Sequence, residues 1–280
     1  MEPENMKWAA DGFCGMEVVM GKLRLGILGN GYLAGIVVEA FEKGLLPEYE
    51  LVGIMGRTPE KTGALAERAG CAPCGSIGEL LDRKLDYIAE AASVAAVRDY
   101  AVRILEAKCG LVVLSIGAFA DRSFYEQVEK AAAANGARVH IASGAVGGFD
   151  VLRTIALMGQ AKAGIETHKG PKSLMNTPLF EESLLTDGEE RHVFEGNAKE
   201  AIGLLPTKVN VAVAASLAAA DPERMRMDIY SVPGFVGDDH RITSEIDGVK
   251  AVVDIYSSTS AIAGWSLVAV LRNLVSPIVF

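Results

Sequence analysis

The sequence predicts an α/β protein: a parallel sheet with helices on both faces, followed by a smaller α+β domain. Three observations support this prediction. Short apolar runs alternate with helical patterns from residue 23 to about residue 143, a glycine turn follows the first run, and the alternation stops after Gly148. We therefore expect residues 22–145 to form the first domain and residues 146–259 to form the second.

The first domain is expected to contain five strands and four helices. The strands are the apolar runs Leu23–Leu28, Leu51–Met55, Tyr87–Ala91, Leu111–Ile116 and Val139–Ala142. The helices are Leu33–Lys43, Pro59–Ala69, Val97–Lys108 and Ser123–Asn135. Ligands of such sheets bind at the carboxyl ends of the strands. The segments at these ends are Gly29–Gly31, Gly56–Thr58, Ala92–Val94, Ser115–Ala118 and Ser143–Gly148.

The second domain is predicted from a different order of elements. They are a helix at Phe149–Met158, an extended stretch at Ala163–Lys169, a polar acid-rich segment at Phe180–Glu195, a helix at Asn210–Ala220, and strands at Arg226–Val232, Arg241–Ile246 and Val249–Ser257. A last helix, Ser260–Leu274, is expected to pack back on the first domain together with the rest of residues 260–280. Residues 1–21 are acidic at their start and lack an apolar core, so we expect a disordered or expression-derived tail rather than a signal peptide.

The turn after the first strand carries the strongest functional signal. Residues 29–34 read Gly-Asn-Gly-Tyr-Leu-Ala, a G-x-G-x-x-A pattern between a strand and a helix. The first glycine permits the tight turn, the second lets a pyrophosphate approach the backbone, and Ala34 lets the helix pack closely on the strand. A plain strand–turn–helix is the alternative. The context favours a Rossmann-type dinucleotide site, with contacts from Gly29, Gly31, Tyr32 and Leu33 and, at a later strand end, from Ala92 and Ser93.

The end of the second strand bears on the choice of cofactor. In NAD sites an acidic residue there binds the adenosine ribose. This sequence has Arg57 and Thr58 instead. A guanidinium suits a 2′-phosphate, so NADP is favoured over NAD, although Arg57 also has a simpler interpretation as a solvated loop residue.

Composition excludes several classes of protein. The chain has 280 residues and a net charge of −9, without a basic cluster, so nucleic acid is not an expected partner. Its longest late apolar run is too short to span a membrane. The four cysteines are Cys14, Cys71, Cys74 and Cys109. The single C-x-x-C pair cannot supply a four-ligand zinc site, so we expect no metal, reduced thiols and a cytoplasmic location.

A series of segments carries a family resemblance through its order and spacing. The segments are residues 29–34, 90–93, 115–121, 143–150, 194–201, 206–212, 239–240 and 259–260. In these segments the sequence resembles the L-aspartate dehydrogenase family from about Lys22 onward. The resemblance implies a homodimeric enzyme that oxidises L-aspartate with NAD or NADP to iminosuccinate, which hydrolyses to oxaloacetate and ammonia or feeds NAD biosynthesis. It also implies that Ala145 and Asn210 contact the cofactor and that His240 is the catalytic histidine.

Three departures from the family pattern concern the substrate side. The stretch Ser231–His240 lacks the usual A-D-P and the Asn two residues before the histidine. Ser258 replaces a lysine of the late motif, and the lysine-proline motif reads Lys169-Gly-Pro-Lys172. These departures leave the fold and the redox class unchanged, but the exact substrate stays open.

Residue chemistry is consistent with this resemblance. Oxidation of an amine to an imine needs a base that titrates near neutrality, and histidine is suited to that role. We expect His240 in a loop, where Asp238 and Asp239 raise its pKa or orient it. His140 is expected in the core and His192 at a solvated surface, while His168 remains a candidate site residue.

Substrate carboxylates need cations or hydrogen-bond donors. The candidates are Lys169, Lys172 and Arg241 and the hydroxyls of Ser143, Ser258, Thr259 and Ser260; the predicted substrate-binding set is Ser143, Lys169, Thr259 and Ser260. Most exposed cations bind nothing, so each has a simpler interpretation. A sugar or polyol oxidoreductase, whose usual Glu-Lys-Pro is missing from residues 112–117, and a non-catalytic NADP-binding protein are the alternative functions.

Overall fold

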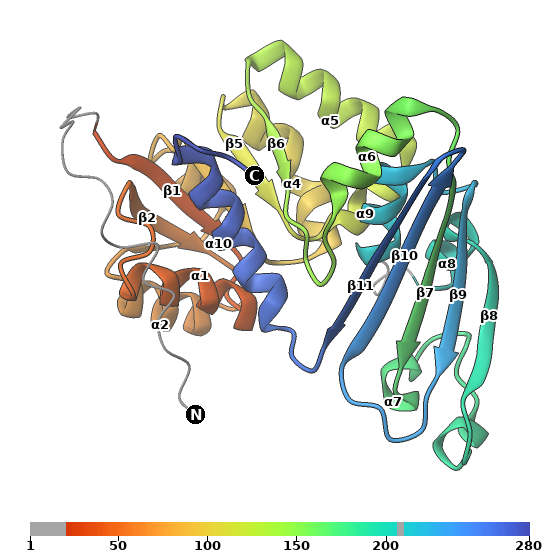
Figure 1. Ribbon diagram of the computed structural model, residues 1–280. Coiled ribbons are helices and arrows are strands. Elements are labelled where there is room, and N and C mark those ends of the chain that lie inside the picture. The colour runs from red at the N-terminus through yellow and green to blue at the C-terminus, as the bar shows by residue number, and fades with distance from the viewer. Residues whose placement is uncertain (1–20, 206–209) are drawn as a thin grey trace, which may run out of the picture.

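The computed structural model describes residues 21–205 and 210–280. The expected N-terminal tail, apart from Gly21, therefore lies outside the described residues, as do Cys14 and residues 206–209 of the family segments. Two sheets stand side by side, with helices between them and around the first (Figure 1).

The first sheet is parallel and has the order β3-β2-β1-β4-β5-β6. Its strands are β1 (Leu23–Leu28), β2 (Tyr49–Met55), β3 (Ala72–Cys74), β4 (Tyr87–Glu90), β5 (Gly110–Val113) and β6 (Val139–Ile141). Its helices are α1 (Tyr32–Glu42), α2 (Pro59–Ala69), α3 (Ile77–Leu81), α4 (Val94–Glu106) and α5 (Arg122–Asn135), with a 3-10 turn η2 (Ile116–Ala120). The order reverses between β1 and β4, where sheets of this type bind nucleotides. The predicted Rossmann-type sheet is confirmed.

The second sheet is mixed and has the order β11-β10-β7-β9-β8. Its strands are β7 (Lys162–Lys169), β8 (Arg191–Asn197), β9 (Met225–Ser231), β10 (Asp238–Ile246) and β11 (Val249–Ser257). The other elements are α6 (Phe149–Met158), α7 (Pro171–Leu174), η3 (Glu182–Leu185), α8 (Ala198–Leu204) and α9 (Asn210–Ala219). Helices α6 and α9 lie between the two sheets (Figure 1). The inner face of the second sheet is apolar at its centre, where Ile165 of β7 pairs with Ile242 of β10.

Helix α10 (Ala261–Val275) leaves the second sheet and packs against α1 of the first (Figure 1). The contact is close at Gly264, where an added Cβ would lie 2.6 Å from Ile36 Cδ1. At the other end of the helix, the Tyr49 hydroxyl donates a 2.7 Å hydrogen bond to the carbonyl of Leu271. The end of the chain is thereby fixed to the first sheet.

The sequence prediction missed two strands, both at sheet edges. β3 has three residues and includes Pro73, which lacks an N–H and is tolerated at an edge. β8 falls in the segment interpreted only as polar and acid-rich, because an edge strand that is half exposed needs few apolar residues. The segment Cys71–Cys74 overlaps β3, and Cys71, Cys74 and Cys109 are free thiols.

Candidate functional site

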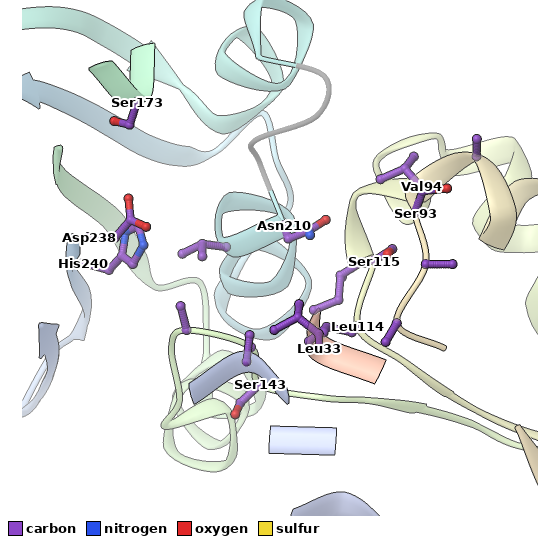
Figure 2. Close-up of a pocket in the computed structure, with 18 of the residues that line it drawn as sticks. Leu33, Ser93, Val94, Leu114, Ser115, Ser143, Ser173, Asn210, Asp238 and His240 are labelled. Atoms are coloured by element: carbon purple, nitrogen blue, oxygen red, sulfur yellow. The ribbon is translucent and has the colours of Figure 1, made fainter. Parts of the chain in front are cut away.

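Two adjoining cavities lie at the carboxyl ends of the strands of the first sheet. The first, about 660 Å³, extends from β4 and β5 to the inner face of the second sheet. The second, about 500 Å³, lies over the β1–α1 and β2–α2 loops. They share Ala91, Ala92, Ser93 and Ala95 as lining residues, so a ligand can occupy both. Figure 2 shows the first cavity, with Asp238 and His240 on one side and Ser93, Leu114 and Ser115 on the other.

The glycine turn after β1 packs closely against the backbone that follows β4. Gly29 has φ +134°, and a Cβ there would lie 2.4 Å from the Ala91 carbonyl oxygen, so a larger residue does not fit. Gly31 is the N-cap residue of α1, and no side chain caps the first N–H groups of that helix. Unsatisfied N–H groups at a helix start favour a phosphate. Gly29 and Gly31 line the second cavity and Leu33 lines the first, whereas Tyr32 lines neither and is exposed.

The β2–α2 loop forms the far end of the second cavity. Arg57, Thr58 and Lys61 line it, and neither cation pairs with an acidic side chain in the part of the chain that the structure describes. Asn30 fixes this loop, because its amide donates 2.9 Å hydrogen bonds to the Thr58 carbonyl and to the Thr62 hydroxyl. Two exposed cations therefore lie where the sequence prediction placed one.

Glu90, the last residue of β4, lies beneath the junction of the two cavities and is fully buried. Its carboxylate accepts five hydrogen bonds of 2.8–3.1 Å. The donors are the backbone N–H groups of Ala92, Ser93, Leu114 and Ser115 and the Ser115 hydroxyl. Burial raises the pKa of Glu90, and the hydrogen bonds from Ser115, Ala92 and Leu114 oppose that change. Glu90 thus joins the loops after β4 and β5, which both line the first cavity.

Asn210 and the loop after β6 close the first cavity between the sheets. The Asn210 side-chain oxygen accepts a 2.8 Å hydrogen bond from the Gly117 N–H, which links the start of α9 to η2 of the first sheet. Ser143, Gly144 and Ala145 line the same cavity. The Gly144 N–H donates to the Ser266 hydroxyl at 3.0 Å, which ties this loop to α10.

His240 lies in β10 and not in a loop, which corrects the sequence expectation. It is 4% exposed, lines the first cavity, and pairs across the sheet with Thr167 of β7. Its pKa is lowered from 6.5 to about 4, first by burial and then by the charge of Lys169; Asp238 acts in the raising direction but is outweighed. The imidazole is therefore neutral at pH 7: Asp238 acts in the predicted direction, but burial and Lys169 outweigh it, so the net pKa is lowered.

Lys169 and Asp238 form the next cross-strand pair on the same face of the sheet as His240 and Thr167. The Lys169 ammonium donates a hydrogen bond to Asp238 Oδ1 and forms an ion pair with it. Both residues line the first cavity. Lys169, the predicted partner of a substrate carboxylate, thus already pairs with Asp238. The sequence prediction considered Asp238 only as a neighbour of His240.

Other sequence candidates lie outside the two cavities. Thr259 and Ser260 are exposed in the turn before α10, and Lys172 and Ser258 also line neither cavity. Arg241 lies on the outer face of β10, with its guanidinium 3.5 Å from Asp254. The structure therefore brings Ser143 and Lys169 into the cavity with His240 and does not place Thr259 and Ser260 there.

The other three histidines lie away from the cavities. The His168 and His192 rings stack on either side of Tyr230, with centroids 4.8 and 4.5 Å from it, on the opposite face of the second sheet. His140 is half-buried beside Tyr87, and burial lowers its pKa. Among the described residues, His192, Glu195 and Asp228 have ligand atoms close enough for a metal ion, but Arg226 already pairs with both carboxylates.

Sequence reasoning missed the roles of four residues. Glu90 lies in residues 90–93, one of the segments that carry the family resemblance. A single acidic residue at the end of an apolar strand could have indicated its role. Lys61 follows Arg57 by four residues on the same loop and helix start. Asn30 and Thr167 gave no signal, because their contacts join segments 28 to 73 residues apart.

Comparisons with known proteins agree with this geometry. The family described as "Aspartate dehydrogenase, C-terminal" matches residues 150–274, and the one described as "Homoserine dehydrogenase, NAD binding domain" matches residues 29–142. An L-aspartate dehydrogenase of Methanococcus maripaludis is 31% identical over 265 residues, which cover 91% of this chain and 98% of that protein. One from Methanosarcina mazei is 30% identical over 267 residues, with the same coverage.

Solved structures give the same result. The aspartate dehydrogenase of Thermotoga maritima matches with a TM-score of 0.76 and 28% identity, covering 93% of this chain and all of that one. A myo-inositol dehydrogenase of Corynebacterium glutamicum matches with a TM-score of 0.51 and 14% identity over 88% of this chain and 86% of that one, which is a likeness of fold alone. Across residues 21–205 and 210–280, none of the helices has the length and apolarity that a membrane crossing requires.

The fold, the paired cavities and these relatives place the chain among the NAD(P)-dependent amino-acid dehydrogenases, and it is an enzyme of that class. Within the class, the match to a 31% identical relative over almost the whole of both chains is decisive. The chain belongs to the aspartate dehydrogenase family.

Proposed function

We propose that this enzyme oxidises the amine of L-aspartate to iminosuccinate, which then hydrolyses to oxaloacetate and ammonia. The observation that carries the proposal is His240, a buried neutral imidazole at the wall of a cavity that continues into the glycine-turn cavity. The relatives named L-aspartate dehydrogenase support the substrate.

His240 is the proposed general base. Its Nδ1 faces the Thr167 hydroxyl, so Nε2 is the ring nitrogen left to take a proton from the substrate ammonium. Loss of a hydride from the α-carbon of the resulting amine would leave the iminium form of iminosuccinate, and bound NAD or NADP would supply the hydride acceptor. A substrate carboxylate at Lys169 would counteract the Lys169 charge, which is the second cause, after burial, of the low His240 pKa.

The residues of the second cavity fit a dinucleotide. Gly29 leaves no room for a Cβ, and the start of α1 offers uncapped N–H groups to the diphosphate. Ala92, Ser93, Ala145 and Asn210 are the proposed contacts toward the nicotinamide end. Arg57 and Lys61 support a preference for NADP, since both cations suit a 2′-phosphate and no acid occupies the end of β2.

The wider organisation follows from these assignments. Residues 22–145, with the helix of residues 260–280, are proposed to bind the cofactor, and residues 146–259 to bind the substrate. Helices α9 and α10 pack within the chain, so the proposed homodimer uses the outer face of the second sheet, where Val252 and Tyr256 are exposed. A role in NAD biosynthesis and a cytoplasmic location complete the proposal, the latter supported by the three free thiols.

A panel of L-amino acids and polyols, assayed with NAD and with NADP, tests the function. The expected result is reduction of NADP with L-aspartate. The His240→Ala variant should lose turnover but retain cofactor binding, measured by fluorescence titration. The matched control is His192→Ala, which changes a histidine outside both cavities. Turnover of polyols alone, tight cofactor binding without turnover, or normal turnover by His240→Ala would each refute a part of the proposal.

A further inference from the structure

The residue pairs between β7 and β10 change from apolar to polar to charged toward the cavity mouth. Ile165 pairs with Ile242 in the core, Thr167 pairs with His240 at the cavity wall, and Lys169 pairs with Asp238 at the rim. All six side chains share one face of the sheet, because alternate residues of a strand point to the same side. The base proposed for the reaction therefore lies next to an ion pair.

Among the described residues that line the first cavity, Lys169 and Asp238 are the only lysine, arginine, aspartate or glutamate side chains. The Lys169 side chain is 14% exposed and that of Asp238 is 42% exposed, so the lysine is the deeper of the two. Asp238 uses Oδ1 for Lys169, and Oδ2 has no hydrogen-bond partner among the described residues. The cavity thus presents a cation and an anion side by side, with one carboxylate oxygen free.

An α-amino acid at neutral pH has the complementary arrangement. Its carboxylate and its ammonium are attached to the same carbon, so they can lie against neighbouring charges of opposite sign. A carboxylate suits the ammonium of Lys169, and the substrate ammonium suits Asp238 Oδ2. Asp238 and His240 are two residues apart on the same strand face, so the nitrogen held by Asp238 would be next to the imidazole.

We propose that Asp238 binds the α-ammonium of the substrate and presents its nitrogen to His240, while Lys169 binds the α-carboxylate. The inference rests on the proposed function and adds the group that distinguishes an amino acid from a hydroxy acid or a polyol. A ligand without an ammonium can make the contact with Lys169 but not the charge-assisted hydrogen bond with Asp238, so it should bind more weakly.

Two ligands that differ only in the ammonium test this assignment. L-Aspartate and succinate are titrated against the NADPH-bound protein, in which no hydride transfer can occur. The wild type is expected to bind L-aspartate about tenfold or more tightly than succinate. In Asp238→Asn, which keeps the size and removes the charge, the ratio of the two affinities should fall to about one.

The control is Asp239→Asn, the neighbouring acid on the opposite face of β10, which should keep the wild-type ratio. Because Asp238→Asn leaves Lys169 without its partner, a double variant, Lys169→Met with Asp238→Asn, removes both charges and should also lose the discrimination. Thermal denaturation establishes that each variant is folded, and the double variant decides the question if the single one is not.

An affinity ratio that these variants leave unchanged would overturn the inference. Failure of the proposed function is a separate result, because it is the absence of turnover of L-aspartate by the wild type with either cofactor. The ratio is measured without turnover, so the two failures are distinguishable.

Discussion

The hydroxyl of Thr167 lies 3.0 Å from Nδ1 of His240, the residue directly opposite it in the sheet, and both side chains are buried. For Nε2 to accept a proton, Nδ1 must carry the ring hydrogen and donate it to Thr167 Oγ1. We predict that Thr167→Val, which removes the acceptor, lowers kcat about tenfold, the cost of one buried hydrogen bond. Thr167→Ser should restore most of the activity. Steady-state kinetics measure both, and equal kcat values for Val and wild type would contradict this role.

The low pKa of His240 predicts how activity depends on pH. A base with a pKa of about 4 stays neutral far below the usual 6.5, so the acid limb of kcat/KM should lie near pH 4–5. Lys169 lowers this pKa, and therefore Lys169→Met should move the limb to higher pH. An unchanged limb in that variant, measured in the same buffers, would mean that a different group titrates.

The same histidine couples folding to pH. Between pH 6.5 and about 4 the unfolded chain binds a proton at His240 that the folded protein does not, so its contribution is present above pH 6.5 and is lost as the pH falls to about 4. The loss should be roughly 3 kcal/mol. His240→Asn should lack it, which urea denaturation at pH 7 and pH 4.5 can measure. Parallel losses in wild type and variant would exclude this contribution.

The β2–α2 loop predicts the selectivity for the cofactor. Arg57→Ala with Lys61→Ala removes both cations from the second cavity, so the KM for NADP should rise at least about tenfold while that for NAD changes little. Arg68→Ala is a suitable control, because Arg68 pairs with Glu42 on the surface and lines neither cavity. An equal effect on both cofactors would argue against a 2′-phosphate contact.

Glu90 predicts a large effect on stability. Glu90→Ala leaves four backbone N–H groups and a hydroxyl without their acceptor, so the free energy of unfolding should fall by at least about 3 kcal/mol. Ser115→Ala loses one of the five bonds and should lose about 1 kcal/mol. Urea denaturation of both variants gives the comparison, and a loss below about 1 kcal/mol in Glu90→Ala would refute the importance of this network.

The first sheet was largely predictable from the sequence because its strands are buried on both faces. Runs such as residues 25–28 and 111–113 are continuously apolar and buried, and the glycine turn marks the switch point. β3 was not predictable, since three edge residues including Pro73 carry no strand pattern.

The second sheet was harder to predict because inward-facing and exposed residues alternate along its strands. Asp238-Asp239-His240-Arg241 appears polar throughout, so it suggests a loop, yet its alternate residues face the cavity and the outer surface. The sequence indicated His240 mainly through the family resemblance, with its position beside two carboxylates as a weaker signal. The pairing of Lys169 with Asp238 and of Thr167 with His240 depends on a strand register that joins residues far apart in the chain.

Glu90 also sets the direction in which a dinucleotide can lie. Its carboxylate accepts hydrogen bonds from the backbone N–H groups after β4 and β5. The Ser93 hydroxyl caps α4 by accepting a hydrogen bond from the Ala96 N–H. Of the two helix starts at the junction of the cavities, α1 therefore has the unoccupied amides. In the proposed binding mode a diphosphate therefore lies over β1 and not over β4, so head and tail of the cofactor are not interchangeable. In that binding mode, this asymmetry directs the adenosine end toward Arg57 and the reactive end toward His240.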